Sequence, residues 1–164
     1  MNKCRFILSK VIGIVFIVNC LFFTFVMPTW AVSYGSGNLI DSDFSGRDLT
    51  EDIFDHANLR SSNLSHVNAQ GVRFFAANLE SVNLEGANLS YADLESARLT
   101  YSNLTNAILV GAFLTNAKLG GATIDGADFT EALLTPLEEE RLCKIAKGTN
   151  PVTGRKTKET LFCP

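Results

Sequence analysis

A repeat of five residues runs through most of this chain and constrains its fold more than any other feature. From Leu39 to Leu134, every fifth position carries a large apolar residue, with no insertion or deletion and with Ala69 as the one exception. The 20 positions hold 14 Leu, 4 Phe, 1 Ile and 1 Ala. A fixed period maintained over this length is typical of a solenoid, in which each repeat packs against its neighbours around a continuous interior.

A second position in each repeat carries small residues. Two residues before each large apolar position, from Ala57 to Ala132, the chain holds 11 Ala, 3 Val and 2 Ser. A five-residue period fits neither a helix nor a pleated strand, because the repeated position would drift around the helix or change face. A chain that turns by a constant angle per repeat keeps both positions inside. We therefore predict a buried core that includes Leu79, Leu84, Leu89, Leu94, Leu99, Leu104, Leu109 and Leu114.

The repeated unit, Ala-(Asn/Asp)-Leu-x-x, resembles the pentapeptide-repeat family across residues 37–135. Ala87-Asn88-Leu89 and Ala92-Asp93-Leu94 are examples of the unit. The resemblance implies an all-β solenoid, a right-handed quadrilateral β-helix with four repeats per coil, and therefore about five coils here. Residues 20 positions apart would lie above one another. Stacked Asn amides, such as those of Asn58 and Asn78, are expected to hydrogen-bond along the column or to hold local turns.

Residues 136–164 are predicted to form a capping helix and a tail, because a stacked column exposes apolar side chains at its ends. Thr135 is a suitable cap and Pro136 a suitable first helical residue. Gly148 would end the helix after Lys147. The chain after the turn at Asn150-Pro151 is expected to be extended. The residues expected to face the last coil are Leu137, Leu142, Ile145 and Ala146.

Residues 1–31 are interpreted as an export signal that is cleaved after Ala31, with residues 32–36 as a lead-in. Lys3, Arg5 and Lys10 make the start positive, and an apolar run spans residues 11–27. The run is long for a signal, so an uncleaved membrane anchor is the alternative. Cleavage would remove three of the 14 basic residues and none of the 17 acidic ones, which changes the net charge from −3 to −6.

The predicted mature chain keeps two cysteines, Cys143 and Cys163. An even number of cysteines in an exported protein favours a disulfide, which here would tie the end of the chain to the capping helix. About the last 25 residues also resemble the C-terminal segment of pentapeptide-repeat proteins exported to the thylakoid lumen of cyanobacteria and chloroplasts. This resemblance implies a location in the thylakoid lumen or the periplasm of a photosynthetic organism.

The polar residues indicate no catalytic site, metal site or cofactor. The two histidines, His56 and His66, lie two repeats apart and would face opposite sides of a four-sided coil. We find no nucleophile–His–acid set, phosphate-binding loop or calcium loop. The repeat region holds 13 acidic and 5 basic residues, which argues against nucleic acid as a partner. No membrane contact is expected after cleavage, and the chain is predicted not to be an enzyme.

The candidate binding surface is an apolar patch late in the repeats. It consists of outward positions on two adjoining faces, namely Ile108, Val110, Phe113 and Leu133. An exposed patch of this kind marks a protein-binding site. The alternative is that the tail, through Leu161 and Phe162, covers it.

The leading hypothesis for function is a non-enzymatic binding or structural scaffold with an unknown protein partner in the lumen or periplasm. The chain is expected to be a monomer or a weak oligomer. The family also includes cytosolic proteins that mimic DNA and bind DNA gyrase, which is the alternative function. The acidic repeats of this chain fit that alternative, whereas its export signal does not.

Overall fold

The structure is a computed structural model that describes residues 31–164. The predicted export signal lies outside the described residues except for Ala31. Within the described range, no helix combines the length and apolar character that would be needed to cross a bilayer.

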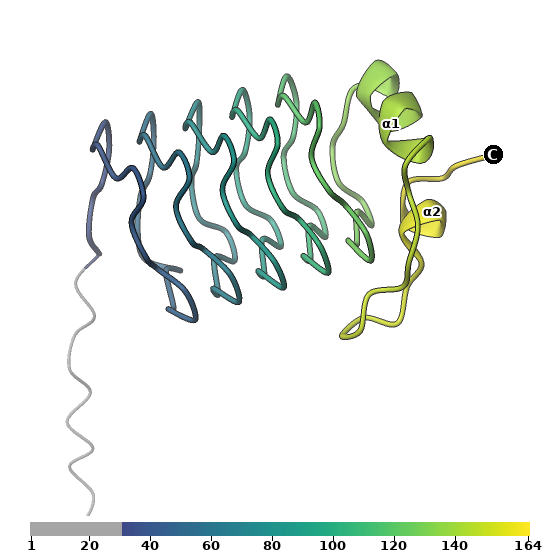
Figure 1. Cartoon of the computed structure of the whole chain (residues 1–164), viewed down its shortest axis with the longest axis horizontal. Helices are drawn as coiled ribbons and strands as arrows, with labels where there is room; N and C mark the ends of the chain where they lie inside the picture. Colours follow the sequence, from purple (N-terminus) through teal and green to yellow (C-terminus); the bar gives the residue numbers. More distant parts are fainter. Residues whose placement is uncertain (1–30) are drawn as a thin grey trace, which may run out of the picture.

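The repeats form one column of stacked turns (Figure 1). Parallel bridges join residues that are 20 positions apart, from Ser33–Ile53 at one end to Phe113–Leu133 at the other, with four bridges in each turn. This register is the one predicted from four repeats per coil. The all-β prediction differs in detail, because the repeats contain single-residue bridges separated by turns and residues 31–164 contain no longer strand. Each side of a turn is too short for more than one bridged residue.

Every corner of the column except the one at Glu51 is a tight turn whose third residue has a positive φ. In the corner after Leu94, Ala97 N–H donates to the Leu94 carbonyl at 3.0 Å, and Ser96 has a φ of 58°. This is the left-handed position that a type II turn requires. Ser96 N–H also donates to Thr115 O in the next turn at 3.0 Å. Bonds between turns therefore hold residues other than glycine in this strained conformation.

The interior contains both repeated positions, as predicted. The eight core leucines between Leu79 and Leu114 are at most 1% exposed, and the small residue Ala97 between them is completely buried. At the N-terminal end, the ring of Phe54 stacks on the rings of Phe74 and Tyr34, with centroid separations of 5.2 Å and 4.8 Å. The interior ladder therefore begins with Tyr34, one repeat before the series seen in the sequence.

The outer Asn residues do both of the things predicted for them. Asn78 Nδ2 donates to Asn58 Oδ1 in the preceding turn at 3.0 Å. The Oδ1 atom of Asn78 accepts the Glu80 backbone N–H at 3.2 Å. One amide thus joins two turns and also fixes the backbone of its own corner.

Helix α1, Pro136–Cys143, follows the last turn and begins as predicted, with Thr135 Oγ1 accepting the Glu138 N–H at 3.4 Å. The predicted end at Lys147 is wrong. The backbone tightens at the end of the helix, where Ile145 N–H donates to Leu142 O at 3.0 Å, and Ala146 is buried. The predicted apolar stripe is correct only for two residues, because Leu137 and Ile145 are exposed while Leu142 and Ala146 are buried.

The tail is not extended as predicted. Thr149 and Lys156 form an antiparallel bridge, and a short helix, α2, spans Thr157–Thr160. Figure 1 shows both helices beside the last turn. Asn150 Nδ2 donates to the carbonyls of Gly126 at 2.9 Å and Asn106 at 3.0 Å, in the last two turns. The tail thus supplies hydrogen-bond partners to an edge that no further repeat covers.

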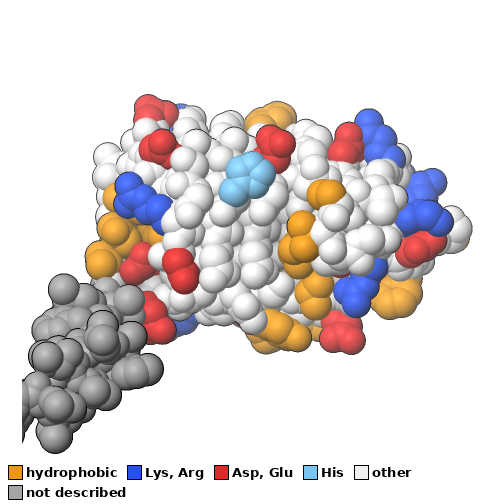
Figure 2. All heavy atoms as spheres, turned by 90° about the horizontal axis from the view of Figure 1, so that it is seen from below, with side chains coloured by type: hydrophobic (Ala, Val, Ile, Leu, Met, Phe, Trp, Pro, Cys, Tyr) orange, Lys and Arg blue, Asp and Glu red, His pale blue; other side chains and the backbone are white. Residues whose placement is uncertain are grey.

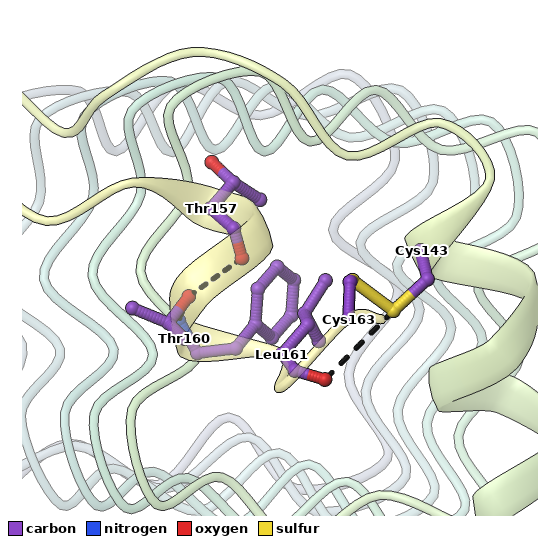
Figure 3. Close-up of a disulfide and its surroundings, with 6 residues drawn as sticks. Cys143, Thr157, Thr160, Leu161 and Cys163 are labelled. Carbon is purple, nitrogen blue, oxygen red and sulfur yellow. Dashed lines mark hydrogen bonds between the residues drawn. A yellow bond between two sulfur atoms is a disulfide. The ribbon is translucent and has the colours of Figure 1, made fainter.

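The disulfide between Cys143 and Cys163 joins the end of α1 to the end of the chain (Figure 3). The two Cα atoms are 5.5 Å apart, and the cysteines are separated by 20 positions in sequence. Cys143 Sγ also lies 3.8 Å from the Leu161 carbonyl oxygen. Because Leu161 is buried, the disulfide lies directly beside the part of the tail that closes the core.

Candidate protein-binding surface

Two of the four predicted patch residues form an exposed apolar pair. Phe113 and Leu133 are joined by a parallel bridge on the last turns of one ladder. Their side chains remain 45% and 52% exposed. The exposed ring of Tyr91 lies against Gly111, at the corner just before Phe113. The sequence pattern did not connect Tyr91 with this patch, because a corner residue leans across the turn that follows it.

The other two predicted residues, Ile108 and Val110, lie on the adjoining face and are half-buried. The residues directly above them in the next turn bind the tail. Arg155 Nη1 donates to Asp128 Oδ2 at 3.4 Å and to Thr130 Oγ1 at 3.1 Å. The tail therefore lies over the end of this face, and the structure separates the predicted patch into a covered part and an open part.

The tail residues expected to cover the patch do not lie on its open part. Leu161 is buried within the hydrophobic core, and Phe162 is itself 79% exposed. The tail instead covers the adjoining face through residues 150–155, as the contacts of Arg155 and Asn150 show. Phe113 and Leu133 form the open surface.

Asp128 is the main charged group beneath the tail. Burial by itself would raise the pKa of this carboxyl, but its interactions together outweigh burial and lower the pKa below the usual value, with hydrogen bonds from the Thr130 hydroxyl and backbone N–H foremost among them. Hydrogen bonding to Thr153 and the nearby Arg155 guanidinium act in the same direction. Asp128 therefore contacts the tail as a carboxylate.

The two histidines lie apart and belong to no cluster. His56 and His66 are exposed corner residues, separated by half a turn of the column. The His56 and Phe75 rings are perpendicular, with their centroids 5.6 Å apart, and the His66 ring lies against Gly86. Within residues 31–164, no group of three or more His, Cys, Asp or Glu side chains is placed to hold a metal ion.

The charged side chains are unevenly distributed along the column. On the face shown in Figure 2, acidic side chains gather near the N-terminal end of the column, whereas Lys and Arg side chains gather over the C-terminal cap, with acidic side chains among them. This agrees with the sequence, in which residues 136–164 carry 6 basic and 4 acidic residues. The acidic repeats thus end in a basic cap.

Two curated proteins similar to this chain are thylakoid lumenal proteins. Two curated relatives from Arabidopsis thaliana are the thylakoid lumenal protein TL20.3, 50% identical over 40 residues, and the thylakoid lumenal 15 kDa protein 1, 48% identical over 40 residues. Each match covers 24% of this chain but only 14% and 18% of the relatives' lengths.

A solved structure covers more of the chain. The crystal structure of a pentapeptide-repeat protein from the Arabidopsis thaliana thylakoid lumen is 37% identical, with a TM-score of 0.56. The alignment covers 80% of this chain and 85% of that protein. The likeness supports a right-handed β-helix for the repeats.

The family model described as pentapeptide repeats matches this chain with eight copies, over residues 38–74, 77–114 and 97–135. These matches include the stacked turns from Asn38 onward, except for residues 75 and 76, and end where α1 begins. Together with the 20-residue register and the lumenal relative of known structure, they show that this chain belongs to the pentapeptide-repeat family.

Proposed function

We propose that this protein is a non-enzymatic scaffold that binds another protein in the thylakoid lumen or the periplasm. The observation that carries the proposal is the exposed Phe113–Leu133 pair. Single exposed apolar residues are common on protein surfaces, but neighbouring ones form a contiguous patch that favours protein contact. Four bridges per turn support a quadrilateral column. The backbone of such a column would hold the pair in a fixed position.

Affinity capture from the lumenal or periplasmic fraction tests the patch. The Phe113→Asp variant should lose a partner that the natural protein retains, without a change in melting temperature. Tyr101→Asp is the matched control, because it removes another exposed aromatic side chain, 67% exposed, from a different face. If Phe113→Asp keeps the partner, or lowers the melting temperature, the side chain serves packing and the proposal is wrong.

The proposed location rests on the lumenal relatives and on the composition of residues 1–31. Export with cleavage after Ala31 predicts a mature protein that begins at Val32 and fractionates with soluble lumenal or periplasmic proteins. N-terminal sequencing of the isolated protein measures this directly. Full-length protein in the membrane fraction would instead support the uncleaved anchor.

A gyrase-binding role is the second candidate, and the excess of acidic residues in the repeats favours it. A DNA mimic needs a carboxylate-rich surface and access to the cytosol. Unprocessed cytosolic protein that inhibits gyrase supercoiling would support this role over the scaffold. Processed protein outside the cytosol would exclude it, because the two proteins would not meet.

A further inference from the structure

We propose that a groove between α1 and the corner at residues 119–121 binds a phosphate-type oxyanion. The groove has a volume of about 510 Å³ and lies on a different ladder from the Phe113–Leu133 pair. Arg98 and Lys118 line it from the column, and Arg141 lines it from α1. Three cationic side chains thus converge in a protein whose repeats carry an excess of acidic residues.

The sequence of the ladder changes where the groove begins. Asn38, Asn58 and Asn78 are joined by side-chain hydrogen bonds, and Arg98 and Lys118 then occupy the next two positions. The bridge between Arg98 and Lys118 places two positive residues on adjacent turns, about 4.8 Å apart along the column. Like charges directly opposite each other destabilise a ladder. A bound anion would offset this repulsion.

Lys118 also leaves a backbone donor free that an Asn would satisfy. On the neighbouring ladder, Asn103 Oδ1 accepts the Thr105 N–H at 3.1 Å, two residues further along. Lys118 has no acceptor atom in its side chain, so the Gly120 N–H lacks the corresponding bond. A Cβ added to Gly120 would come no closer than 4.0 Å to a neighbouring side chain, so the surface beside this glycine is uncrowded.

Two backbone N–H groups, those of Leu119 and Gly121, face the end of the column at this corner. In the preceding turn, Leu99 N–H donates to Lys118 O at 2.8 Å and Tyr101 N–H donates to Gly120 O at 3.0 Å. The corresponding donors of the last turn, Leu119 and Gly121, and the Gly120 N–H between them, have no acceptor within residues 31–164. Successive backbone N–H groups of this kind bind anions.

The charges in the groove are only partly neutralised. Arg98 pairs with Glu80 at 3.3 Å and Arg141 with Glu138 at 3.3 Å, but both arginine side chains are more than half exposed. Exposed pairs of this kind are weak and can rearrange. Lys118 has no acidic partner within 4.0 Å in the described part of the chain. A multiply charged anion with several acceptor oxygens suits a lining of this kind.

Titration of the ¹⁵N-labelled full chain with inorganic phosphate, followed by amide NMR at constant ionic strength, tests the site. We expect saturable shifts at the Leu119, Gly120 and Gly121 amides. Lys118→Asn should weaken binding by about tenfold or more, since a charge-assisted hydrogen bond is lost. Its melting temperature should stay equal or rise, because the Oδ1 atom of an Asn at this position can accept the Gly120 N–H. Arg141→Gln should also weaken phosphate binding, because it removes the positive charge that α1 contributes to the groove.

Arg73→Asn is the matched control, because it makes the same change of charge at the same repeat position on another ladder. It should leave the affinity unchanged. A second titration with O-phosphoserine identifies which ligand the site prefers. Tighter binding of inorganic phosphate supports a site for the free ion, and tighter binding of O-phosphoserine supports a site for a phosphorylated group. Equal weakening by Lys118→Asn and Arg73→Asn, equal shifts with chloride, or no shift at all would overturn the proposal.

Discussion

Gly148 shows how a single residue determines whether the tail can reach the column. The sequence suggested that this glycine ends a helix, but α1 ends five residues earlier. Gly148 has a φ of +81°, and a Cβ at this position would lie 2.7 Å from the backbone nitrogen of Gly126. The absence of a side chain therefore permits close contact between two backbones, which local sequence patterns do not reveal.

Gly148→Ala should consequently destabilise the protein by more than its backbone strain alone. A left-handed Ala costs about 1–2 kcal/mol, and the backbone collision adds to this value. Gly154→Ala is the control, because Gly154 has a similar φ of +70° and no neighbouring atom within 4 Å of an added Cβ. Urea unfolding of both variants should show the larger loss for Gly148→Ala. Equal losses would mean that the tail moves away from the column without cost.

Ala97 tests whether the small position limits the width of the interior. The residue is completely buried between equally buried leucines of its own and adjacent turns. Ala97→Leu should therefore destabilise the column by about 1–3 kcal/mol or more through overpacking. Glu85→Leu adds the same side chain at an exposed position and should change stability little. Thermal melting of both variants measures the difference, and unchanged melting of Ala97→Leu would contradict the packing described here.

The cap elements were predictable only where local signals decide the structure. Thr135 and Pro136 begin α1 as predicted, because a cap and a first-turn proline act within a few residues. Ile145 and Ala146 continue the apolar pattern, yet they leave the helix because Ala146 docks on the core. Helix α2 has four residues, too few for any periodicity to reveal. The basic groove joins Arg98 and Arg141, which are far apart in sequence.

The disulfide should stabilise the cap more than the column. Closing a loop of about 20 residues contributes about 3 kcal/mol by restricting the unfolded chain. Reduction should therefore lower the melting temperature, while the circular dichroism of the repeats below the transition stays the same. The double variant Cys143→Ser, Cys163→Ser should melt like the reduced protein and should not respond to reductant. Identical melting of oxidised and reduced protein would show that buried contacts of Leu161 and Thr160 suffice.

The hydrogen bonds of Asp128 to Thr130, supported by the tail residues Thr153 and Arg155, should make stability depend on acidic pH. The pKa of Asp128 is lowered in the folded protein, so the unfolded chain binds a proton more readily. Its contribution to the unfolding free energy is thus complete above the unfolded pKa of about 3.9 and is lost as the pH falls through the folded pKa. Urea unfolding between about pH 5 and pH 2 should show this loss. The Asp128→Asn variant should be less stable at neutral pH, and its unfolding free energy should change less with pH than that of the natural protein. If the unfolding free energy of the variant changes with pH as steeply as before, Asp128 is not the cause of the pH dependence.

At the scale of the whole molecule, the column is a one-dimensional structure in which each turn contacts only the adjacent turns. Every ladder, whether of interior leucines, aromatic rings or outer amides, repeats after 20 residues. The stacking of the whole column is the feature that the sequence predicts best, because a period maintained without insertion restricts every repeat in the same way. The stability of such a solenoid is approximately a sum over its turns and the interfaces between them.

A deletion of one complete turn should therefore be tolerated, whereas a slightly shorter deletion should not. Removal of residues 77–96 places Ala97 directly after Ala76 and keeps every following residue on its ladder. The shortened protein should fold, with the spectrum of the natural protein and a lower melting temperature, since one turn and one interface are lost. Removal of residues 77–94 takes out less of the chain but shifts the pattern by two positions, so the large apolar side chains no longer follow one another inside. This variant should be unfolded or aggregated, as measured by circular dichroism and size-exclusion chromatography. If both deletions are equally stable, continuity of the ladders is not what holds the column together.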